Sequence, residues 1–231
     1  MNRAFHLAAL AGVILAAPLQ ARQTVWRFDR TDRLGGLATT VLGHPAVLRD
    51  AGHKAVLFDG VGDALLVGAH PLAGAGQFTV EAMLRPDGGA FEQRWLHLAS
   101  DDPVSQTRIM FEIRVTKDGW YLDAFIKGKG YAQVLIDPAK LHPLGRWYHV
   151  AQSFDGTTYR SYVNGVLEGE AKVAGFSPQP EGSSAVGMRM NRVNFFQGAI
   201  RSIRFTDRAL SPARFHKGGI QPEPMAAPKL P

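Results

Sequence analysis

The sequence predicts an all-β sandwich that follows an export signal, and three observations lead to this prediction. The 231-residue chain has 25 glycines and 14 prolines, which separate short runs rich in Val, Ile, Phe and Tyr. Short runs at close, regular spacing are typical of a sandwich or barrel. Several runs alternate strictly between apolar and polar residues, whereas helical periodicity is weak after residue 22. The chain after the signal is also short enough, at about 210 residues, to form one β domain.

The first 21 residues have the features of a cleavable signal peptide. Arg3 gives a positive start, and residues 4–17 are apolar apart from His6. This run is too short to cross a bilayer, which needs about 20 residues, and Ala21 offers a cleavage point. We therefore expect a signal peptide over residues 1–21, no transmembrane segment, and a periplasmic or secreted protein. The chain has no cysteine, so disulfides, thiolate chemistry and a lipid anchor on cysteine are excluded.

The chain is basic, with a formal net charge of +6. Residues 189–217 hold seven Lys or Arg residues (Arg189, Arg192, Arg201, Arg204, Arg208, Arg214 and Lys217) and one acid, Asp207. Such a surplus serves solubility, or it indicates an acidic partner, because net charge bears on partners rather than on fold. Both interpretations stay open. For an exported protein, an anionic polysaccharide or a membrane surface fits the second better than a nucleic acid.

The clearest local element is a hairpin over residues 107–127. Residues 107–115 and 120–127 alternate, and the turn between them ends at Gly119, which is free to adopt a positive φ. A four-residue loop pairs Val115 with Trp120. The apolar pairs that follow are Ile113–Leu122, Phe111–Ala124 and Ile109–Ile126, and the pairs on the other face are Arg114–Tyr121, Glu112–Asp123, Met110–Phe125 and Arg108–Lys127. A slip of one residue would mix the two faces, so the pattern fixes the register.

Other elements follow from the same reasoning. Residues 78–85 alternate, with Phe78, Val80, Ala82 and Leu84 on one face. After Gly130 a third strand of the hairpin sheet is predicted, with Ala132, Val134 and Ile136 buried and Tyr131 and Gln133 on the polar face. Ser211 and Pro212 favour one short turn of helix. The proline-rich residues 218–231 are predicted to be a disordered tail.

Several segments, in order, resemble a known family. They are residues 26–29 (WRFD), 55–60 (AVLFDG) with Asp63, 78–82 (FTVEA), 146–151 (RWYHVA), 155–157 (DGT) with 162–165 (YVNG), 196–200 (FQGAI) and 208–211 (RALS). Together they resemble a laminin-G-like domain of the concanavalin A-like lectin/glucanase type. The resemblance implies a two-sheet antiparallel jelly-roll sandwich over residues 22–217. Members of this superfamily include lectins, adhesion modules, glycosidases and lyases, so the likeness does not choose a function.

The resemblance also implies roles for single residues. Relatives hold calcium with the Asp that corresponds to Asp59 and with an acid after the "G-x-I" motif, but Arg201 occupies that second position here. A guanidinium would repel the ion, which seeks about six to eight oxygen ligands. We therefore expect no cofactor, with calcium as the alternative, and an Arg201–Asp59 salt bridge in its place. Trp147 corresponds to a framework aromatic and is expected in the core. His97 and His149 are expected to be hydrogen-bonded structural residues.

By the same resemblance, the ligand would be a polysaccharide or glycoconjugate bound on the concave sheet. The predicted contact residues are Trp95, Arg108, Glu112, Arg114, Tyr121, Asp123, Lys127, Tyr131 and Gln133. Aromatic rings offer flat apolar faces with polar tips, and Arg or Lys can hold carboxylate or sulfate groups. Glu112 opposite Asp123 places like charges together, so cations, a metal or a ligand must offset their repulsion. We expect this face to be solvated.

Two alternatives stay open. The first is an enzyme, either a glycosidase using Glu112 and Asp123 or a polysaccharide lyase using Tyr131. Residues 127–133 (KGKGYAQ) resemble a strand of jelly-roll alginate lyases but depart from it at Lys129, and the other lyase motifs are missing. The glycosidase signature of alternating acids is missing as well, because Arg114 follows Glu112 where an acid belongs. The second alternative is an adhesion or structural domain that contacts a protein through residues 189–217.

Overall fold

The structure is a computed structural model that describes residues 21–50, 52–102, 104 and 107–216. The predicted signal peptide, apart from Ala21, and the predicted C-terminal tail lie outside the described residues. No helix in the described part of the chain is long and apolar enough to cross a membrane.

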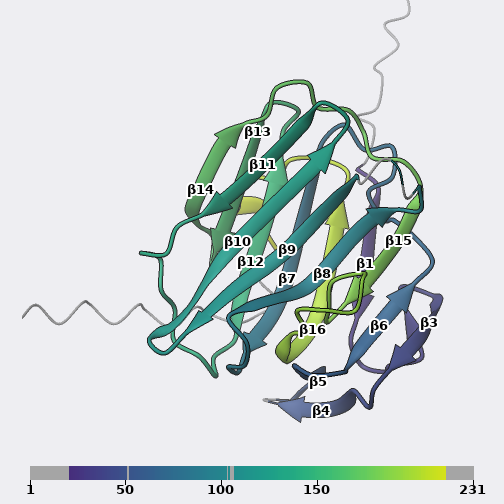
Figure 1. Ribbon diagram of the computed structural model, residues 1–231, viewed down its shortest axis with the longest axis vertical. Coiled ribbons are helices and arrows are strands. Elements are labelled where there is room, and N and C mark those ends of the chain that lie inside the picture. The colour runs from purple at the N-terminus through teal and green to yellow at the C-terminus, as the bar shows by residue number, and fades with distance from the viewer. Residues whose placement is uncertain (1–20, 51, 103, 105–106, 217–231) are drawn as a thin grey trace, which may run out of the picture.

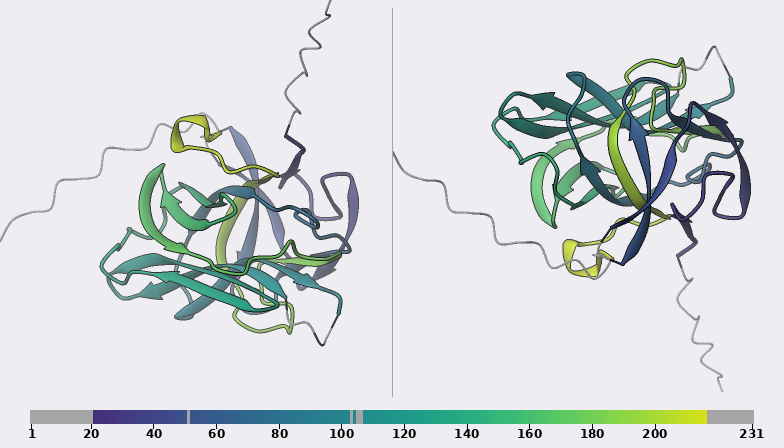
Figure 2. Two further views of the ribbon diagram at one scale, coloured as in Figure 1. Left: turned by 90° about the horizontal axis from the view of Figure 1, so that it is seen from above. Right: turned by 90° about the horizontal axis from the view of Figure 1, so that it is seen from below.

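Two antiparallel sheets lie face to face, as the sequence predicts (Figures 1 and 2). Sheet I contains, in spatial order, β14 (Val166–Lys172), β13 (Thr158–Val163), β12 (Tyr148–Phe154), β7 (Phe78–Pro86), β16 (Gln197–Thr206), β5 (His53–Asp59) and β4 (Ala46–Asp50), with β1 (Gln23–Arg27) also paired to β16. Sheet II contains β11 (Tyr131–Ile136), β10 (Gly119–Gly128), β9 (Arg108–Thr116), β8 (Glu92–Ser100), β15 (Gly182–Val186), β6 (Ala64–Val67), β3 (Leu37–Leu42) and β2 (Arg33–Leu34). The predicted jelly-roll sandwich is confirmed.

The core fills the space between the sheets. Trp26, Trp95 and Trp120 are among its largest fully buried side chains. On β7, Phe78, Val80, Ala82 and Leu84 point into the core, as the alternation predicts. A single 3-10 helix, η1 (Pro212–Arg214), follows Ser211 in the described chain, although Ser211 makes no side-chain cap.

The outer face of β7 is also covered, which alternation alone does not predict. Residues 208–216 run across it and are held by Thr79, whose hydroxyl donates to the Arg208 carbonyl and accepts from the Leu210 amide. Phe215 packs on Tyr162 and His149. Residues on this face of β7, such as Glu81, are therefore buried.

The hairpin formed by β9 and β10 has the predicted register throughout. Val115 pairs with Trp120, Glu112 with Asp123, and Arg108 with Lys127. The predicted apolar face of the hairpin lies in the core. The alternation therefore fixed both the loop length and the inward side of these two strands.

The predicted orientation of β11 is wrong. Gly128 pairs with Tyr131 and Ile126 with Gln133, so Tyr131 and Gln133 are on the core side of the sheet. Val134 and Ile136 are instead 45% and 46% exposed on the outer face. The two-residue turn after Gly128 sets this parity, and the ring of Tyr131 occupies the space where a side chain at position 128 would lie. The apolar character of Val134 and Ile136 was a poor guide to their burial, because β11 is an edge strand.

Candidate functional site

The centre of the predicted contact surface, on the outer face of sheet II, is a buried ionic network. Arg94 lies 2.7 Å from Glu92 and 2.9 Å from Glu112. Arg114 lies 3.1 Å from Glu112 and also pairs closely with Asp123. Glu112 is only 1% exposed and Asp123 4%. The prediction that this face is solvated is therefore wrong at its centre, where Tyr121 is buried as well.

A loop that the sequence did not place covers part of this face. Residues 189–195 lie against β8, where the Arg94 amide donates to the Asn194 carbonyl at 3.0 Å. The Met190 amide donates to Nδ1 of His97 at 2.9 Å. Burial, with nearby arginines, lowers the pKa of His97 to about 3, so this histidine is neutral and structural as expected. His149 is also hydrogen-bonded, to Glu81 at 3.1 Å.

The directly opposed carboxylates Glu112 and Asp123 are both held in the buried ionic network. Burial raises the pKa of both groups, while Arg94 and Arg114 oppose the shift. The arginines also offset the like-charge repulsion between Glu112 and Asp123, for which the sequence analysis expected cations, a metal or a ligand. Arg94 was not among the predicted residues. The only sequence signal for Arg94 was its position two residues after Glu92. A bulge in β8 next to Arg94 turns Trp95 inward.

The other predicted contact residues separate into two groups. Trp95 is in the core, packed on Phe111, and Tyr131 lies at the core edge with its hydroxyl donating to the Ser177 carbonyl at 3.2 Å. Burial raises the pKa of Tyr131, which favours the protonated hydroxyl over the tyrosinate. Arg108 and Lys127 remain half-exposed on the outer face of sheet II, with Arg108 over the ring of Phe125 at 5.1 Å.

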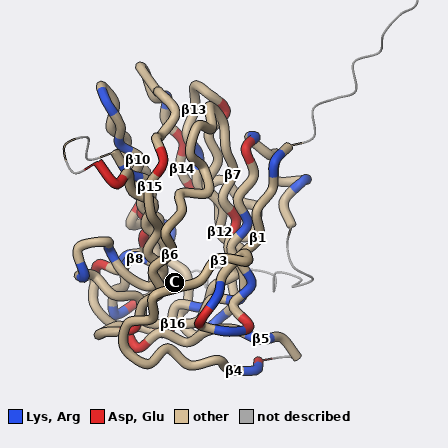
Figure 3. The backbone as a smooth tube through the Cα atoms, turned by 90° about the vertical axis from the view of Figure 1, so that its right-hand side faces the viewer, with Lys and Arg blue, Asp and Glu red and all other residues tan. Residues whose placement is uncertain are grey.

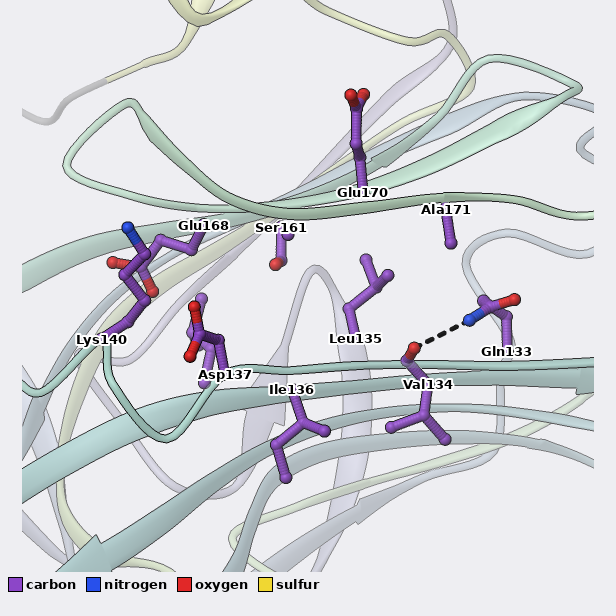
Figure 4. Close-up of a pocket in the computed structure, with 12 residues that line it drawn as sticks. Gln133, Val134, Leu135, Ile136, Asp137, Lys140, Ser161, Glu168, Glu170 and Ala171 are labelled. Carbon is purple, nitrogen blue, oxygen red and sulfur yellow. Dashed lines mark hydrogen bonds between the residues drawn. The ribbon is translucent and has the colours of Figure 1, made fainter.

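Gln133, another predicted contact residue, lines a cavity. We call this cavity the edge cleft, because it lies between β11 and β14, the edge strands of the two sheets (Figures 1 and 4). Its volume is about 260 Å³. It is lined by Leu122, Gln133, Val134, Leu135, Ile136, Asp137, Lys140, Ser161, Glu168, Gly169, Glu170 and Ala171. In Figure 4, Leu135 points towards Ser161 on β13, whereas Val134 and Ile136 point away.

The polar groups of the edge cleft are only partly satisfied. Glu168 has a side chain that is 8% exposed, and its Oε1 atom lies 2.7 Å from Nε2 of His142. Its Oε2 atom is buried without a hydrogen-bond partner among the described residues. The side-chain amide nitrogen of Gln133 donates to the backbone carbonyl of Val134 at 2.8 Å (Figure 4). The side-chain carbonyl oxygen of Gln133 remains as an acceptor. The cleft therefore offers carboxylate, amide, hydroxyl and ammonium groups beside the apolar side chains of Leu122, Leu135 and Ala171.

The two residues tied to the calcium question are arranged differently from the prediction. Asp59 accepts from the backbone amides of residues 61–63 at 2.8–3.0 Å. Burial opposes the effect, but these amides hold the pKa of Asp59 below its usual value. Arg201 does not pair with Asp59; it lies 3.9 Å from the ring of Trp147 and donates to the Asp50 carbonyl at 3.2 Å. Trp147 is thus a half-buried outer-face residue, not a core aromatic. The described residues contain no group of three metal-ligating side chains.

A family model places these features in context. The laminin G-type model of the concanavalin A-like lectin/glucanases superfamily matches residues 59–214, about two thirds of the chain. The chain belongs to this superfamily. The match includes both β9–β10 and the strands that border the edge cleft. Comparison with curated protein sequences gives no significant match.

Three solved structures with the same fold include two with a bound sugar. Domain 4 of AbnA, a GH43 extracellular arabinanase from Geobacillus stearothermophilus in complex with arabinotriose, is 20% identical with a TM-score of 0.63, covering 84% of this chain and 96% of that domain. The ligand-binding domain of botulinum neurotoxin serotype D with N-acetylneuraminic acid is 13% identical, with a TM-score of 0.58 and coverages of 82% and 48%. NanB sialidase from Streptococcus pneumoniae is 18% identical, with a TM-score of 0.52 and coverages of 63% and 26%.

At these identities the similarity establishes the fold alone. The chain spans nearly the whole arabinanase domain, but only about half of the toxin domain and a quarter of the sialidase. The activities of those larger proteins are therefore not transferred to this chain by the match.

Proposed function

We propose that this protein is a non-catalytic glycan-binding module and that one sugar unit binds in the edge cleft. The observation that carries the proposal is the Glu168 carboxylate, which lines the cleft and has one oxygen held by His142 and the other without a partner among the described residues. A buried polar atom without a partner costs about 1–3 kcal/mol, and a ligand hydroxyl that donates to Glu168 would remove that cost.

The chemistry of the cleft suits a sugar. A sugar ring carries hydroxyls that both donate and accept, and Gln133, Ser161 and Lys140 supply complementary groups along one cleft. Leu135 and Ala171 supply apolar surface for the ring's C–H groups. The lining contains no aromatic side chain, so hydrogen bonds rather than stacking would carry the affinity. Arabinotriose bound to the similar arabinanase domain supports this class of ligand.

The non-catalytic part of the proposal rests on the outer face of sheet II. Acid–base catalysis needs carboxyl groups that a substrate can reach. Glu112 and Asp123 are buried and held by Arg94 and Arg114. Release of reducing ends or of unsaturated products from a polysaccharide would contradict this part of the proposal.

The experiment measures binding of arabinotriose and of a panel of neutral oligosaccharides by calorimetry and on a glycan array. Glu168→Gln removes the charged acceptor, and Gly169→Val fills the cleft, since a Cβ at position 169 already lies 3.3 Å from Ser161 Oγ and 3.4 Å from Leu135 Cβ. Glu181→Gln, at an exposed position outside the cleft, is the matched control. We expect both cleft variants to lose about tenfold or more in affinity, as one or two good hydrogen bonds predict.

Variants on sheet II separate the cleft from the surface predicted by the sequence. If Arg108→Ala or Lys127→Ala abolishes binding while the cleft variants bind normally, the ligand lies on the outer face of sheet II and the cleft proposal is wrong. If no glycan binds to the wild type, the module is not a lectin. A protein-binding role through residues 189–217 would then be the remaining alternative.

We also propose that the protein acts in the periplasm or outside the cell, on the basis of the signal-peptide features of residues 1–21. Mass spectrometry of the protein from cell fractions tests this proposal. We expect an N-terminus at Arg22 in the exported fraction, whereas an intact N-terminus in the cytoplasm would contradict it.

A further inference from the structure

A second cavity lies on the outer face of sheet I. We call it the rear pocket; its volume is about 460 Å³, within the usual range of about 300–1,000 Å³ for small-molecule sites. It is lined by Val25, Arg27, Phe28, Asp29, Gly52, His53, Lys54, Glu81, Ala82, Met83, His149, Arg201, Ser202, Arg204 and His216. These residues come from β1, β5, β7, β12 and β16, from the loops that follow β1 and precede β5, and from the segment that crosses sheet I.

The rear pocket has a surplus of cations. Arg27, Lys54, Arg201 and Arg204 line it, against two carboxylates, Asp29 and Glu81. Figure 3 shows Lys and Arg positions along β1, β5 and β16, the strands that supply these four residues. In the described part of the chain, none of the four cations belongs to a salt bridge.

The hydrogen bonds of Arg201 and Arg204 go to neutral acceptors, and the nearest carboxylate that acts on Arg201 is that of Asp50. Arg204 donates to the neutral Oε1 of Gln23 at 2.5 Å, and Arg201 donates to the backbone carbonyl of Asp50 at 3.2 Å. The Asp50 carboxylate is already taken by Arg85 at 2.9 Å and by the indole of Trp147 at 2.7 Å. The pocket therefore presents positive charge that an anionic ligand would neutralise.

The base of the rear pocket adds a hydrogen-bond requirement. Glu81 and His149 are 3% and 4% exposed and lie 3.1 Å apart, and Oε1 of Glu81 also accepts from the His216 amide at 2.5 Å. Oε2 of Glu81 and Nδ1 of His149 are buried without a hydrogen-bond partner among the described residues. Hydroxyl groups of a ligand could form hydrogen bonds with these two atoms, so the pocket suits a ligand that carries hydroxyl groups as well as negative charge.

We propose that the rear pocket is a second binding site and that it takes an acidic sugar unit. The carboxylate or sulfate of the sugar lies near the cations of β1, β5 and β16, and its hydroxyls hydrogen-bond to Glu81 and His149. A plain inorganic anion would neutralise the cations but has no hydroxyl group to donate to the Glu81 carboxylate. A membrane surface would meet the exposed cations but would leave the hydrogen-bonding atoms of Glu81 and His149 without partners. This site lies on the opposite sheet from the predicted contact surface and does not depend on the edge cleft.

The test uses small probes, because a long polyanion would bind many basic proteins through charge alone. The purified chain is labelled with ¹⁵N and titrated with sodium glucuronate, with glucose and sodium sulfate as comparison probes, and amide shifts are followed by NMR. We expect glucuronate to shift amides of residues 81–83, 149 and 202 with a saturable curve. Glucose should give at least tenfold weaker binding.

Two kinds of variant test the site. Arg27→Gln with Lys54→Gln removes two exposed cations of the pocket and should weaken glucuronate about tenfold, in line with the small energies of exposed ion pairs. Arg33→Gln with Lys117→Gln makes the same charge change at exposed positions outside the pocket and should have no effect. Ser202→Leu fills the pocket without changing its charge and should also abolish the shifts.

Each remaining outcome counts against the proposal. If sulfate binds as well as glucuronate, the pocket is an anion site and the sugar assignment is wrong. If Ser202→Leu leaves glucuronate binding unchanged, the binding is a surface charge effect and the pocket is not the site. Because Glu168→Gln and Gly169→Val affect only the edge cleft, a failure of the glycan-binding proposal there is distinguishable from a failure here.

Discussion

Two pairs of arginines, one pair on the outer face of each sheet, are in opposite electrostatic situations. On sheet II, Arg94 and Arg114 are buried and each is paired with carboxylates, which are Glu92, Glu112 and Asp123. On sheet I, Arg201 and Arg204 have no salt bridge among the described residues, donate hydrogen bonds to neutral acceptors, and line a pocket. The same residue type therefore serves structure in one place and is available for a ligand in the other. The partner, and not the residue type or its strand, makes the difference.

The largest expected effect breaks the sheet II network. Glu112→Ala leaves Arg94 and Arg114 buried with too little negative charge, and removal of one partner from a buried ion pair costs about 3–5 kcal/mol. Urea unfolding followed by tryptophan fluorescence measures the change.

A double variant provides the control for this prediction. Arg94→Met with Glu112→Leu removes one charge of each sign and leaves Arg114 paired with Asp123. It should therefore lose less stability than Glu112→Ala alone, because no buried charge is stranded. A loss of less than about 1 kcal/mol in Glu112→Ala would mean that the network is solvated and available to ligands after all.

An intermediate effect concerns His97, which lies beside the same network. Its pKa is lowered from 6.5 to about 3 by burial first and by Arg189, Arg108 and Arg94 next. As pH falls from about 6.5 towards 3, the unfolded chain takes up a proton that the folded chain refuses, so stability falls with decreasing pH. His97→Asn retains an acceptor for the Met190 amide and removes the titrating ring. The slope of stability against pH should decrease by up to about 1.4 kcal/mol per pH unit in this window.

Two comparisons make the pH result specific. His53→Asn changes an exposed histidine and should leave the slope unchanged. Burial also lowers the pKa of His70, so some acid sensitivity should remain in His97→Asn. Identical pH profiles for wild type and His97→Asn would show that His97 is protonated without cost in the folded state.

The smallest expected effect is on the stability of the rear-pocket variants. Arg27→Gln with Lys54→Gln should change the free energy of unfolding by less than about 0.5 kcal/mol, because these cations are exposed and have no salt bridge in the described structure. Thermal and urea unfolding in the absence of ligand measure it. A loss of more than about 1 kcal/mol in the free energy of unfolding would show that Arg27 and Lys54 stabilise the fold, as Arg94 and Arg114 of sheet II do.

The local pattern of the sequence was sufficient where two strands are joined by a short turn. Alternation across residues 107–127 gave the loop, the register and the inward face of β9 and β10. The same reasoning failed on β11, because the two-residue turn after Gly128 reversed the side that its apolar residues face. Alternation also names two faces without saying what covers the outer one, and the loop over residues 189–195 lies against Arg94 and His97 of β8 there.

The candidate sites were harder to predict, because each combines residues that are distant in the sequence. Of the predicted contact residues, Gln133 alone lines either of the two cavities formed by the described residues, and its partners in the edge cleft, such as Glu168, come from another sheet. The basic segment 189–217 was recognised as a unit, but the structure divides it. Arg201 and Arg204 line the rear pocket, whereas Arg189 lies close enough to His97 to lower its pKa.

The sequence by itself determined the superfamily, the two-sheet architecture and the pairing of β9 with β10, because these follow from local alternation, turns and ordered motifs. Only the tertiary structure decided which polar side chains are paired, buried or free to meet a ligand. The physical reason is that the energy of a charged group depends on its partners and its distance from water. In a jelly roll, both are set by strands and loops that lie far apart along the chain.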